Sequence, residues 1–409
     1  MRTSLLVISA CILSFVGCAS ANTTMPQPLH NTMADQSSRT TPTIVPSNGF
    51  SVLYMFTGGV DGDEPIGNLV RDAAGNLYGT TQFGGYDPNG HGGFGVVFKL
   101  SPNGHEKVLH TFTGPDGAYP HAGLVRDAAG NLYGTTFGGG ASREGVVFEV
   151  DANGVETVLH SFSGADGNGP FAGLVRDAAG DLYGTAGYGG AFSSCVGGNG
   201  CGVVFKLDAK RRYHVLHNFS GLDGSTPEGD LIRDAAGNLY GTTLGGGAHS
   251  TGVAFKLDPS GHEGVVYSFK HADGSPLAGL VRDAVGNLYG TTYTGGDKDG
   301  GIAFKLDTSG TETVLQSFNG MNGYVPQGDL IRDAAGDLYG MTYFGGTYRW
   351  YGVIFKLDPS GNETVLHVFN PIDGSNPVGG LVRDTAGNFY GATTLGGRPN
   401  SGVVFELTR

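Results

Sequence analysis

The sequence is poor in charge and lacks helical patterning. Only 15% of its 409 residues are charged, and no run of its 24 lysines and arginines is long enough to follow a phosphate backbone. A protein that follows nucleic acid needs such a basic track, and the formal net charge here is −13, so we expect no nucleic-acid partner. Apolar residues at helical spacing are absent as well, which argues against a helical fold.

Familiar catalytic patterns are missing too. The chain shows no Ser, His and Asp constellation, no paired catalytic carboxylate motif and no nucleotide-binding loop. The glycine pairs after each "GTT" follow a predicted strand but open no helix, so they are not phosphate cradles. Whether the protein is an enzyme is left open by these absences.

The only sustained apolar stretch, residues 5–16, lies behind a basic start and ahead of small residues. This order is typical of a secretory signal over residues 1–21, and the stretch is too short to remain as a membrane anchor. Cys18 in "FVGC" resembles a lipidation site, although Phe15 replaces the usual leucine. Cleavage after Ala21 is the alternative. We therefore expect an exported protein, either anchored through Cys18 or freely secreted, with no other membrane contact.

Residues 22–48 are rich in Thr, Ser, Pro and Asn, a composition that predicts a flexible polar linker ahead of a folded domain at 49–409. Cysteine is scarce in that domain, where Cys195 and Cys201 are the only two. In an exported chain this close pair favours a disulfide. The alternative, a zinc site, lacks two further ligands nearby.

What the sequence has in abundance is glycine, 75 residues, and repetition. The segment "RDAAGNLYGTT" begins at Arg71 and recurs with a period of about 49 to 57 residues, which is typical of propellers and arrays. Each copy holds four short apolar runs separated by Gly, Asp and Asn, which predicts four antiparallel strands. Seven copies are present, beginning at Arg71, Arg126, Arg176, Arg233, Arg282, Arg332 and Arg383.

The two ends of the repeat region complement each other. The region starts at Phe50 with a run that matches the fourth strand of a copy, and it ends at Arg409 after the third. A four-stranded sheet that is apolar on both faces is buried by radial stacking, and residues 51–56 complete the last sheet. We therefore predict an all-β, seven-bladed β-propeller of four-stranded antiparallel blades, closed by the N-terminal strand. We expect it to be a monomer.

The motifs "RDAAGNLYGTT" and "GVVFKLDPSG" resemble those of NHL-type propellers. At finer grain, "GNLYGTT", "GVVFKLD" and "TVLHSF" from about Phe50 to Arg409 resemble the GloVer repeat family of exported bacterial tandem-repeat proteins. This resemblance implies a fold and an exported location, and it implies no reaction.

Residues that recur in every copy are interpreted as structural. The Asp of each "RDAAGN" accepts backbone N–H groups across its turn, and each Arg pairs with such an Asp in its own or the next blade. A ring of free arginines that binds an anion is the alternative. The turn residues concerned are Asp72, Asp127, Asp177, Asp234, Asp283, Asp333 and Asp384.

Two further recurring positions invite metal hypotheses. The histidines of "VLH" fall in different blades and cannot share one ion, so we expect them to pack with a satisfied hydrogen bond: His110, His160, His217 and His367, where other copies have Tyr54, Tyr267 and Gln316. The "DG" loops read as turns, with calcium as a weak alternative. We predict no metal site and no cofactor. The loop residues are Asp61, Asp116, Asp166, Asp223, Asp273, Asn322 and Asp373.

Function is sought in residues that break the repeat, because a site for one ligand must be asymmetric. The aromatic loop Tyr348, Arg349, Trp350 and Tyr351 suits a sugar or peptide, unless Trp350 merely caps its blade. Just before the inner strand most copies have Gly, but three have Asn68, Asp230 and Asp329. These three either cap their strands or converge at the channel mouth, where they hold a cation or act as an acid/base pair.

Three functions stay open. The favoured one is a non-catalytic exported scaffold that binds a glycan, peptide or protein through the face that carries the variable loops. The second is an enzyme on polysaccharide or a small metabolite, using singular residues such as Asp230, Asp329, His91, His121 or Arg349. The third is a structural protein of the cell surface.

Overall fold

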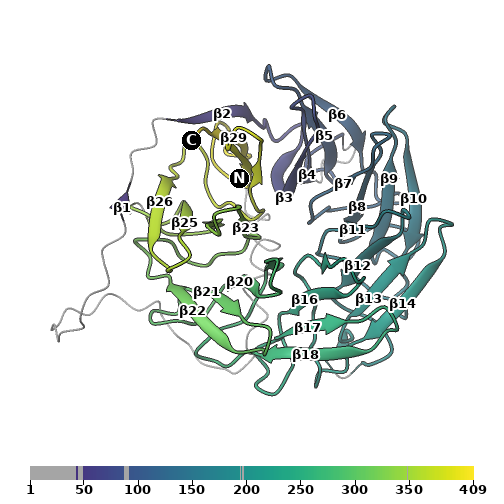
Figure 1. The fold of residues 1–409 in the computed structure, drawn as a ribbon. Coiled ribbons are helices and arrows are strands. Elements are labelled where there is room, and N and C mark those ends of the chain that lie inside the picture. The colour runs from purple at the N-terminus through teal and green to yellow at the C-terminus, as the bar shows by residue number, and fades with distance from the viewer. Residues whose placement is uncertain (1–42, 45–48, 87–91, 194, 196–197, 348) are drawn as a thin grey trace, which may run out of the picture. The chain divides into compact units, whose positions relative to one another are not determined.

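Seven small sheets stand around a common axis in the computed structural model of the protein (Figure 1). The structure describes residues 43–44, 49–86, 92–193, 195, 198–347 and 349–409. Residues 42–409 form one compact unit. Within the described part there is no α-helix, and no helix that is long and apolar enough to cross a membrane. The expected signal, Cys18 and nearly all of the expected linker lie outside the described residues.

Each blade runs from an inner strand to an outer strand, and the inner strand is the shorter of the two in every blade but the first. The first three blades are β3 (Asp63–Arg71), β4 (Leu77–Phe83), β5 (Val96–Leu100) and β6 (Glu106–Thr111); β7 (Val125–Arg126), β8 (Leu132–Thr136), β9 (Val146–Val150) and β10 (Glu156–Ser161); and β11 (Val175–Arg176), β12 (Leu182–Ala186), β13 (Val203–Leu207) and β14 (Tyr213–Asn218). The next three are β15 (Ile232–Arg233), β16 (Leu239–Thr243), β17 (Val253–Leu257) and β18 (Glu263–Ser268); β19 (Val281–Arg282), β20 (Leu288–Thr292), β21 (Ile302–Leu306) and β22 (Glu312–Ser317); and β23 (Ile331–Arg332), β24 (Leu338–Thr342), β25 (Val353–Leu357) and β26 (Glu363–Val368).

The seventh blade closes the ring as predicted. Its strands are β27 (Val382–Arg383), β28 (Phe389–Thr393), β29 (Val403–Leu407) and, from the start of the domain, β2 (Phe50–Met55). Strand β2 pairs antiparallel with β29, with Phe50 opposite Leu407 and Met55 opposite Val403. Strand β1 (Thr43–Ile44), inside the expected linker, adds a parallel edge to β26 of the sixth blade.

The hydrophobic core lies between neighbouring blades rather than inside any one of them. A phenylalanine that follows each outer strand meets a phenylalanine in the third strand of the next blade, as Phe112 meets Phe148 at 5.1 Å between ring centroids. Both rings are fully buried. Edge-on aromatic contacts of this kind add to the burial of apolar surface, so each blade is stable only beside its neighbours.

The Arg and Asp ring is structural, but each arginine acts on the blade before its own. The guanidinium of Arg126 lies 5.6 Å from the ring centroid of Tyr78, and the hydroxyl of Tyr78 donates to Asp72 at 3.0 Å. All seven arginines lie in this way over the tyrosine of the preceding blade, for example Arg71 over Tyr390 and Arg176 over Tyr133. Cation–π contacts therefore join every pair of blades, and the ring is not a set of free arginines.

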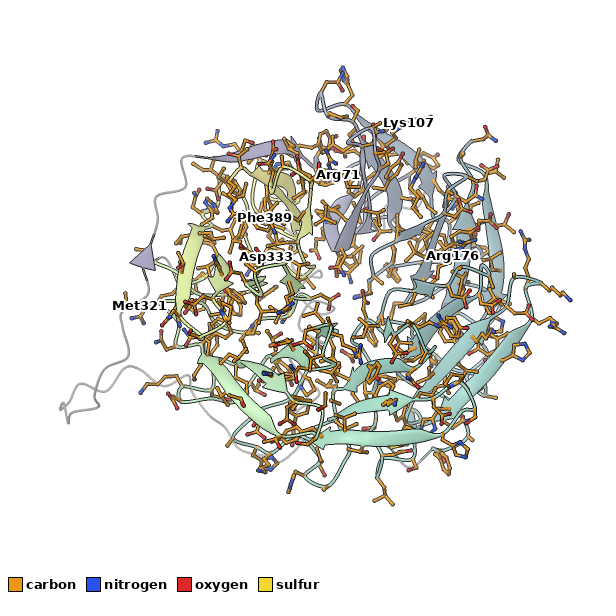
Figure 2. The ribbon with its side chains drawn as sticks, viewed as in Figure 1. Arg71, Lys107, Arg176, Met321, Asp333 and Phe389 are labelled. Atoms are coloured by element: carbon orange, nitrogen blue, oxygen red, sulfur yellow. A yellow bond between two sulfur atoms is a disulfide. The ribbon has the colours of Figure 1, made fainter. Side chains whose placement is uncertain are left out.

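Inner and outer residues are easily told apart in Figure 2. Arg71 and Arg176 lie toward the centre of the ring, whereas Lys107 on β6 and Met321 in a "DG" loop lie at the outer rim. This arrangement separates two places where polar groups from different blades meet, one at the ring axis and one at the rim.

Candidate functional site

Three polar side chains from blades one, four and six meet at the ring axis. The amide nitrogen of Asn68 donates to Asp230 at 3.1 Å and to Asp329 at 2.7 Å. All three keep partial exposure to solvent. The sequence left their convergence open as an alternative to strand capping, and we call the three residues the axial cluster.

Each member of the axial cluster also takes a backbone N–H from the blade before its own. Gly173 donates to Asp230 and Gly279 donates to Asp329, both at 2.6 Å, and Gly380 donates to Asn68. The capping interpretation is therefore correct as well, except that each cap joins two blades. The same position in the seven blades therefore forms three pairs, each of a polar residue and the glycine of the preceding blade. The remaining position, in the second blade, is Gly123.

Electrostatics within the axial cluster favour a retained proton. Burial raises the pKa of Asp230, and the nearby charge of Asp329 raises it further, while the N–H of Gly173 and the amide of Asn68 oppose the shift. Two neighbouring carboxyls that cannot both ionise share one proton. At neutral pH the raised pKa of Asp230 therefore favours its protonated carboxyl, which offers a hydroxyl donor in the cluster.

A second position lies two residues before the position that Asn68, Asp230 and Asp329 occupy in their blades. At this second position each of the seven blades has a different side chain. The position is preceded by proline and followed by glycine or alanine in all seven copies. We call these residues the variable ring: Ile66, His121, Phe171, Glu228, Leu277, Gln327 and Val378. Except for Ile66, they are partly exposed. Of these seven residues only His121 was predicted from the sequence as a candidate site residue. An alignment of the seven copies would have revealed that the other six vary at the same position.

A backbone bend with positive φ aims the variable ring in most blades. The residue before the proline has φ of 56° at Thr226 and 58° at Val325, values that β-branched residues rarely adopt. Hydrogen bonds hold this backbone conformation in place. At Thr226 the N–H donates to the carbonyl of Cys201, and the carbonyl accepts from the N–H of Leu244, each at 2.9 Å. The bend is absent only from the fifth blade, whose loop is one residue shorter.

One side of the variable ring is aromatic. The imidazole of His121 lies 5.4 Å from the rings of both Phe137 and Phe171, and Tyr188 lies 5.8 Å from Phe171. Burial lowers the pKa of His121 to about 4, so its imidazole is neutral at neutral pH. The amide of Gln82 lies 3.0 Å from Nε2 and donates to it, which places the ring proton on Nδ1.

In contrast to this aromatic side, the variable ring has an acidic side chain, Glu228, in the fourth blade. Burial raises the pKa of its carboxyl to about 8, so it is protonated at neutral pH. Its charge in turn contributes, after burial, to the raised pKa of Tyr293 in the fifth blade, so the two side chains are close. No described residue forms a hydrogen bond with this carboxyl, which leaves it available to a ligand.

The predicted aromatic loop lies elsewhere, between β24 and β25. Trp350 is 66% exposed and meets the edge of Phe344 at 6.0 Å between ring centroids, so most of its surface faces solvent instead of covering the blade. Arg349 is exposed with φ of 63°, while Tyr351 packs partly into the core between blades six and seven. Tyr348 and His91 lie outside the described residues. The structure thus brings the three axial residues together but does not bring Arg349, Trp350 and Tyr351 to them.

The predicted disulfide between Cys195 and Cys201 is present, in the loop between β12 and β13. Cys201 is fully buried and belongs to the core between blades three and four. Because both sulfurs are used in the bond, the zinc alternative for this pair is excluded.

At the rim, three of the four repeated histidines have the satisfied hydrogen bond that was expected, and His367 lies 3.4 Å from Asp373 as an ion pair. Nε2 lies beside the aspartate of the following "DG" loop, at 3.0 Å for His110 with Asp116 and 2.9 Å for His217 with Asp223. A β-bulge at Leu109 interrupts the regular alternation of side chains along this strand. The aspartates also accept N–H groups of their own loops, as Asp116 does from Thr113 at 2.8 Å, so they serve the turns.

Buried carboxyls make stability fall as the pH rises. Burial raises the pKa of Glu64, Glu106 and Glu363 to about 7 and that of Glu228 to about 8, from 4.5. Between pH 4.5 and these values the folded chain therefore binds more protons than the unfolded chain. Its free energy of unfolding falls as the pH rises through this range. In the presence of a chelator we expect the midpoint of thermal unfolding to fall by roughly 5 °C between pH 6.5 and 8.5.

The near-isosteric variant Glu363→Gln should weaken that pH dependence, because Gln316 and Asn322 still donate to the remaining oxygen. The measurement is calorimetric or circular-dichroism melting at matched ionic strength. A midpoint that rises with pH, or a variant with the slope of the wild type, would contradict the assignment.

Comparison with known proteins bears out the architecture. Virginiamycin B lyase from Staphylococcus aureus has a TM-score of 0.60 at 14% identity, over 88% of this chain and 99% of its own. The extracellular domain of a one-component system protein from B. thetaiotaomicron has 0.57 at 11% identity, over 88% of this chain but only 40% of its own. PorZ, a surface component of the type-IX secretion system of Porphyromonas gingivalis, has 0.52 at 15%, over 85% and 47%. At these identities the likeness shows the fold alone.

No curated protein matches the sequence. A family model does match nearly all of the propeller, over residues 40–195, 88–281 and 264–409. The repeats that the sequence analysis compared with the GloVer family are therefore those of this model, and the chain belongs to the Gloeobacter/Verrucomicrobia repeat family.

Proposed function

We propose that this protein is an exported binding propeller that holds a glycan end or another hydroxyl-rich ligand at the variable ring. The observation that carries the proposal is the asymmetry of that ring. Its neighbours in the sequence are uniform in all seven copies, yet the ring itself has seven different side chains. A rigid symmetric frame that presents one asymmetric set of side chains has the properties of a ligand site.

The chemistry of the ring suits a sugar. Phe171 and His121 supply aromatic surface on which the apolar face of a pyranose stacks. The protonated carboxyl of Glu228 donates a hydrogen bond, and the carboxylate of the axial cluster accepts one from a hydroxyl. Export is supported by the N-terminal segment and by the Cys195–Cys201 bond, because disulfides persist in oxidising compartments.

The test is a glycan and small-metabolite binding screen on the protein, followed by calorimetric titration of the ligand found. We expect Phe171→Ala and Glu228→Gln each to weaken binding by about tenfold or more, which corresponds to roughly 1.4 kcal/mol. Trp350→Ala is the matched control in the exposed loop and should bind as the wild type does. If Trp350→Ala alone abolishes binding, the site is the β24–β25 loop and this proposal is wrong.

One observation favours an enzyme as the second candidate. At neutral pH the ring holds an unprotonated imidazole at His121 and a protonated carboxyl at Glu228, which are the states required of a general base and a general acid. Turnover of the bound ligand that is lost in Glu228→Gln and in His121→Gln would establish this alternative. Binding without turnover would exclude it for that ligand.

A further inference from the structure

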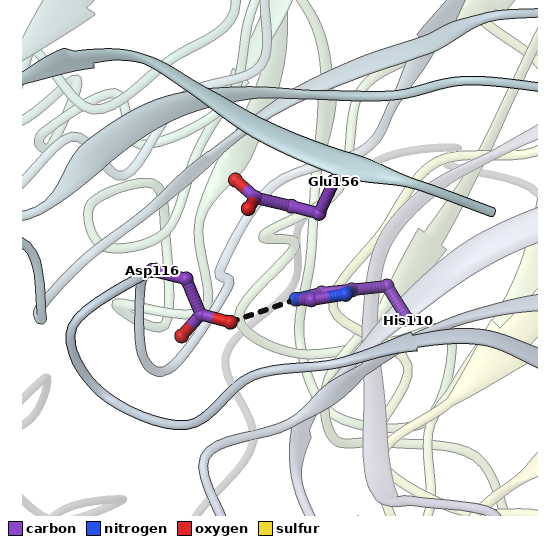
Figure 3. A group of neighbouring side chains, drawn as sticks. All are labelled: His110, Asp116 and Glu156. Carbon is purple, nitrogen blue, oxygen red and sulfur yellow. Dashed lines mark hydrogen bonds and ion pairs between the residues drawn. The ribbon is translucent and has the colours of Figure 1, made fainter.

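The rim contains a second kind of site, formed where two blades meet. Next to each rim histidine and its aspartate lies the first residue of the next outer strand, and in two places this residue is a glutamate. His110, Asp116 and Glu156 form one such group, between blades one and two (Figure 3). His217, Asp223 and Glu263 form the other, between blades three and four. We call these two groups the rim clusters.

In both rim clusters the three donor atoms lie within 4.8 Å of one another. The imidazole nitrogen and the aspartate oxygen are 3.0 Å apart in the first and 2.9 Å apart in the second. Ligands that share one metal at about 2.0 to 2.2 Å lie at similar separations from each other. The aspartates are also held in place through their other oxygen, by Thr113 and by Ser220, as ligands of a preformed site usually are.

The glutamates supply a second, independent observation. No described residue donates a hydrogen bond to Glu156 or Glu263, and in each the Oε1 atom is fully buried without a partner. In Figure 3 the carboxyl of Glu156 extends toward Asp116 and His110. A buried carboxylate oxygen without a partner is costly, and a second carboxylate beside it adds repulsion. A cation between the three side chains removes both costs.

Other blade interfaces give the glutamate a hydrogen-bond donor on Oε2 or replace it, although Oε1 of Glu312 and of Glu363 is buried without a partner there as well. Between blades four and five, Tyr267 donates to Glu312 at 3.1 Å, and between blades five and six Asn322 donates to Glu363 at 2.7 Å. At two more interfaces the glutamate is replaced by an aromatic ring that stacks on the histidine. Tyr213 lies 3.8 Å from His160, and Phe50 lies 3.7 Å from His367.

Three interfaces keep a glutamate without a donor, and two of these add a histidine. The third, at Glu106, has Tyr54 in place of the histidine, and that hydroxyl donates to Asp61 instead. The complete set of one imidazole and two carboxylates therefore occurs only at the two rim clusters among the described residues. A mixed nitrogen and oxygen set of this kind suits a divalent transition metal such as Zn²⁺ or Mn²⁺ better than Ca²⁺, which prefers oxygen alone.

We propose that each rim cluster binds one divalent transition-metal ion, held by an imidazole and a carboxylate of one blade and by a carboxylate of the next. Each ion links an outer strand and a "DG" loop of one blade to the outer strand of its neighbour. Binding therefore stabilises the ring at two of its seven seams, because an ion that binds only the folded chain shifts the folding equilibrium toward it. This proposal is independent of the ligand proposed for the variable ring.

The test uses the full-length chain, stripped with a chelator, dialysed and titrated with Zn²⁺ at pH 7.5 in a calorimeter. We expect the wild type to bind about two equivalents of Zn²⁺ and Glu156→Gln to bind one. The double variant Glu156→Gln with Glu263→Gln should bind none at the rim clusters. His160→Gln is the matched control, because Tyr213 replaces the glutamate there, and it should keep both equivalents. Zn²⁺ should also raise the melting midpoint of the wild type, but not that of the double variant.

A second pair of variants, His110→Gln with His217→Gln, removes the other kind of ligand and covers the case in which the glutamine variants fail to fold. Loss of both equivalents in this pair supports the sites. The proposal is overturned if the wild type binds fewer than two equivalents. It is also overturned if either double variant still binds two.

Discussion

Alanine at Gly379 will destabilise the folded ring by about 3 to 5 kcal/mol, whereas alanine at Gly264 will change its stability by less than about 0.5 kcal/mol. A Cβ atom on Gly379 would lie 2.2 Å from the carbonyl oxygen of Gly67 and 2.6 Å from its carbonyl carbon. These are backbone atoms of the first blade, so no side chain can turn away to relieve the clash. On β18, Gly264 has no heavy atom within 4 Å of the same added carbon.

The measurement is urea unfolding of the two variants and the wild type, followed by circular dichroism, with the midpoint and slope compared. Equal midpoints for Gly379→Ala and the wild type would show that the blades tolerate a wider spacing at the axis. Gly379 belongs to a ring of small residues that precedes the axial cluster position, and every blade has glycine or alanine there: Gly67, Ala122, Ala172, Gly229, Ala278, Gly328 and Gly379.

Small residues at this position also set the geometry of the candidate site. Because neighbouring backbones touch at the small-residue ring, the side chains of Asn68, Asp230 and Asp329 are brought within hydrogen-bonding distance across the axis. The variable ring immediately precedes the small residues, so its side chains are placed by the same contacts.

Removing the closing strand will have the second large effect. A chain that begins at residue 57 should lose cooperative folding, a cost of more than about 5 kcal/mol, which is comparable to the whole stability of many domains. It lacks β2 and with it the pairing to β29 and the fully buried Phe56, whose ring lies 5.1 Å from Phe98 of the first blade. The seventh blade would then expose an unpaired edge and an open seam.

Two longer chains serve as controls for that truncation. A chain that begins at residue 45 loses only β1, whose pairing to β26 is limited to Thr43 with Thr364 and Ile44 with Val365, and it should unfold within about 1 kcal/mol of the full-length protein. A chain that begins at residue 49 should behave in the same way. Size-exclusion chromatography and thermal melting distinguish the outcomes. A sharp, wild-type transition in the chain that begins at 57 would show that closure contributes little.

Prediction from the sequence was most successful where the repeat itself carried the information. Phe50 at one end and Arg409 at the other belong to complementary parts of one four-stranded unit, and that is sufficient to predict a closed ring of seven blades. The disulfide followed from two cysteines close together in a chain expected to be exported. The equivalent positions of Asn68, Asp230 and Asp329 before inner strands suggested two alternatives, strand capping and convergence, and the structure shows that the three side chains meet.

Contacts between blades were predicted less well. The sequence paired each arginine with an aspartate of its own or the next blade. Instead, Arg126 lies over Tyr78 of the preceding blade, and the two turn-aspartate ion pairs, Arg233 with Asp177 and Arg383 with Asp333, also reach the preceding blade. Equal numbers of Arg and Asp do not reveal the direction in which a long side chain crosses to a neighbour. The rim glutamates were overlooked for the same reason, since Glu156 is 40 residues from Asp116 in the chain and meets it only across a blade interface.

By itself the sequence determined the class of fold, the number of blades, the way in which the ring closes and the residues that serve turns. These properties depend on local patterns that recur, and a pattern repeated seven times can be recognised in the sequence alone. Only the tertiary structure decided which singular residues act together. Glu228 and His121 acquire their shifted pKa values from burial among several blades, and the rim clusters arise from side chains that touch across seams. Burial and contact between segments distant in sequence are properties of the closed ring, and no single copy of the repeat contains them.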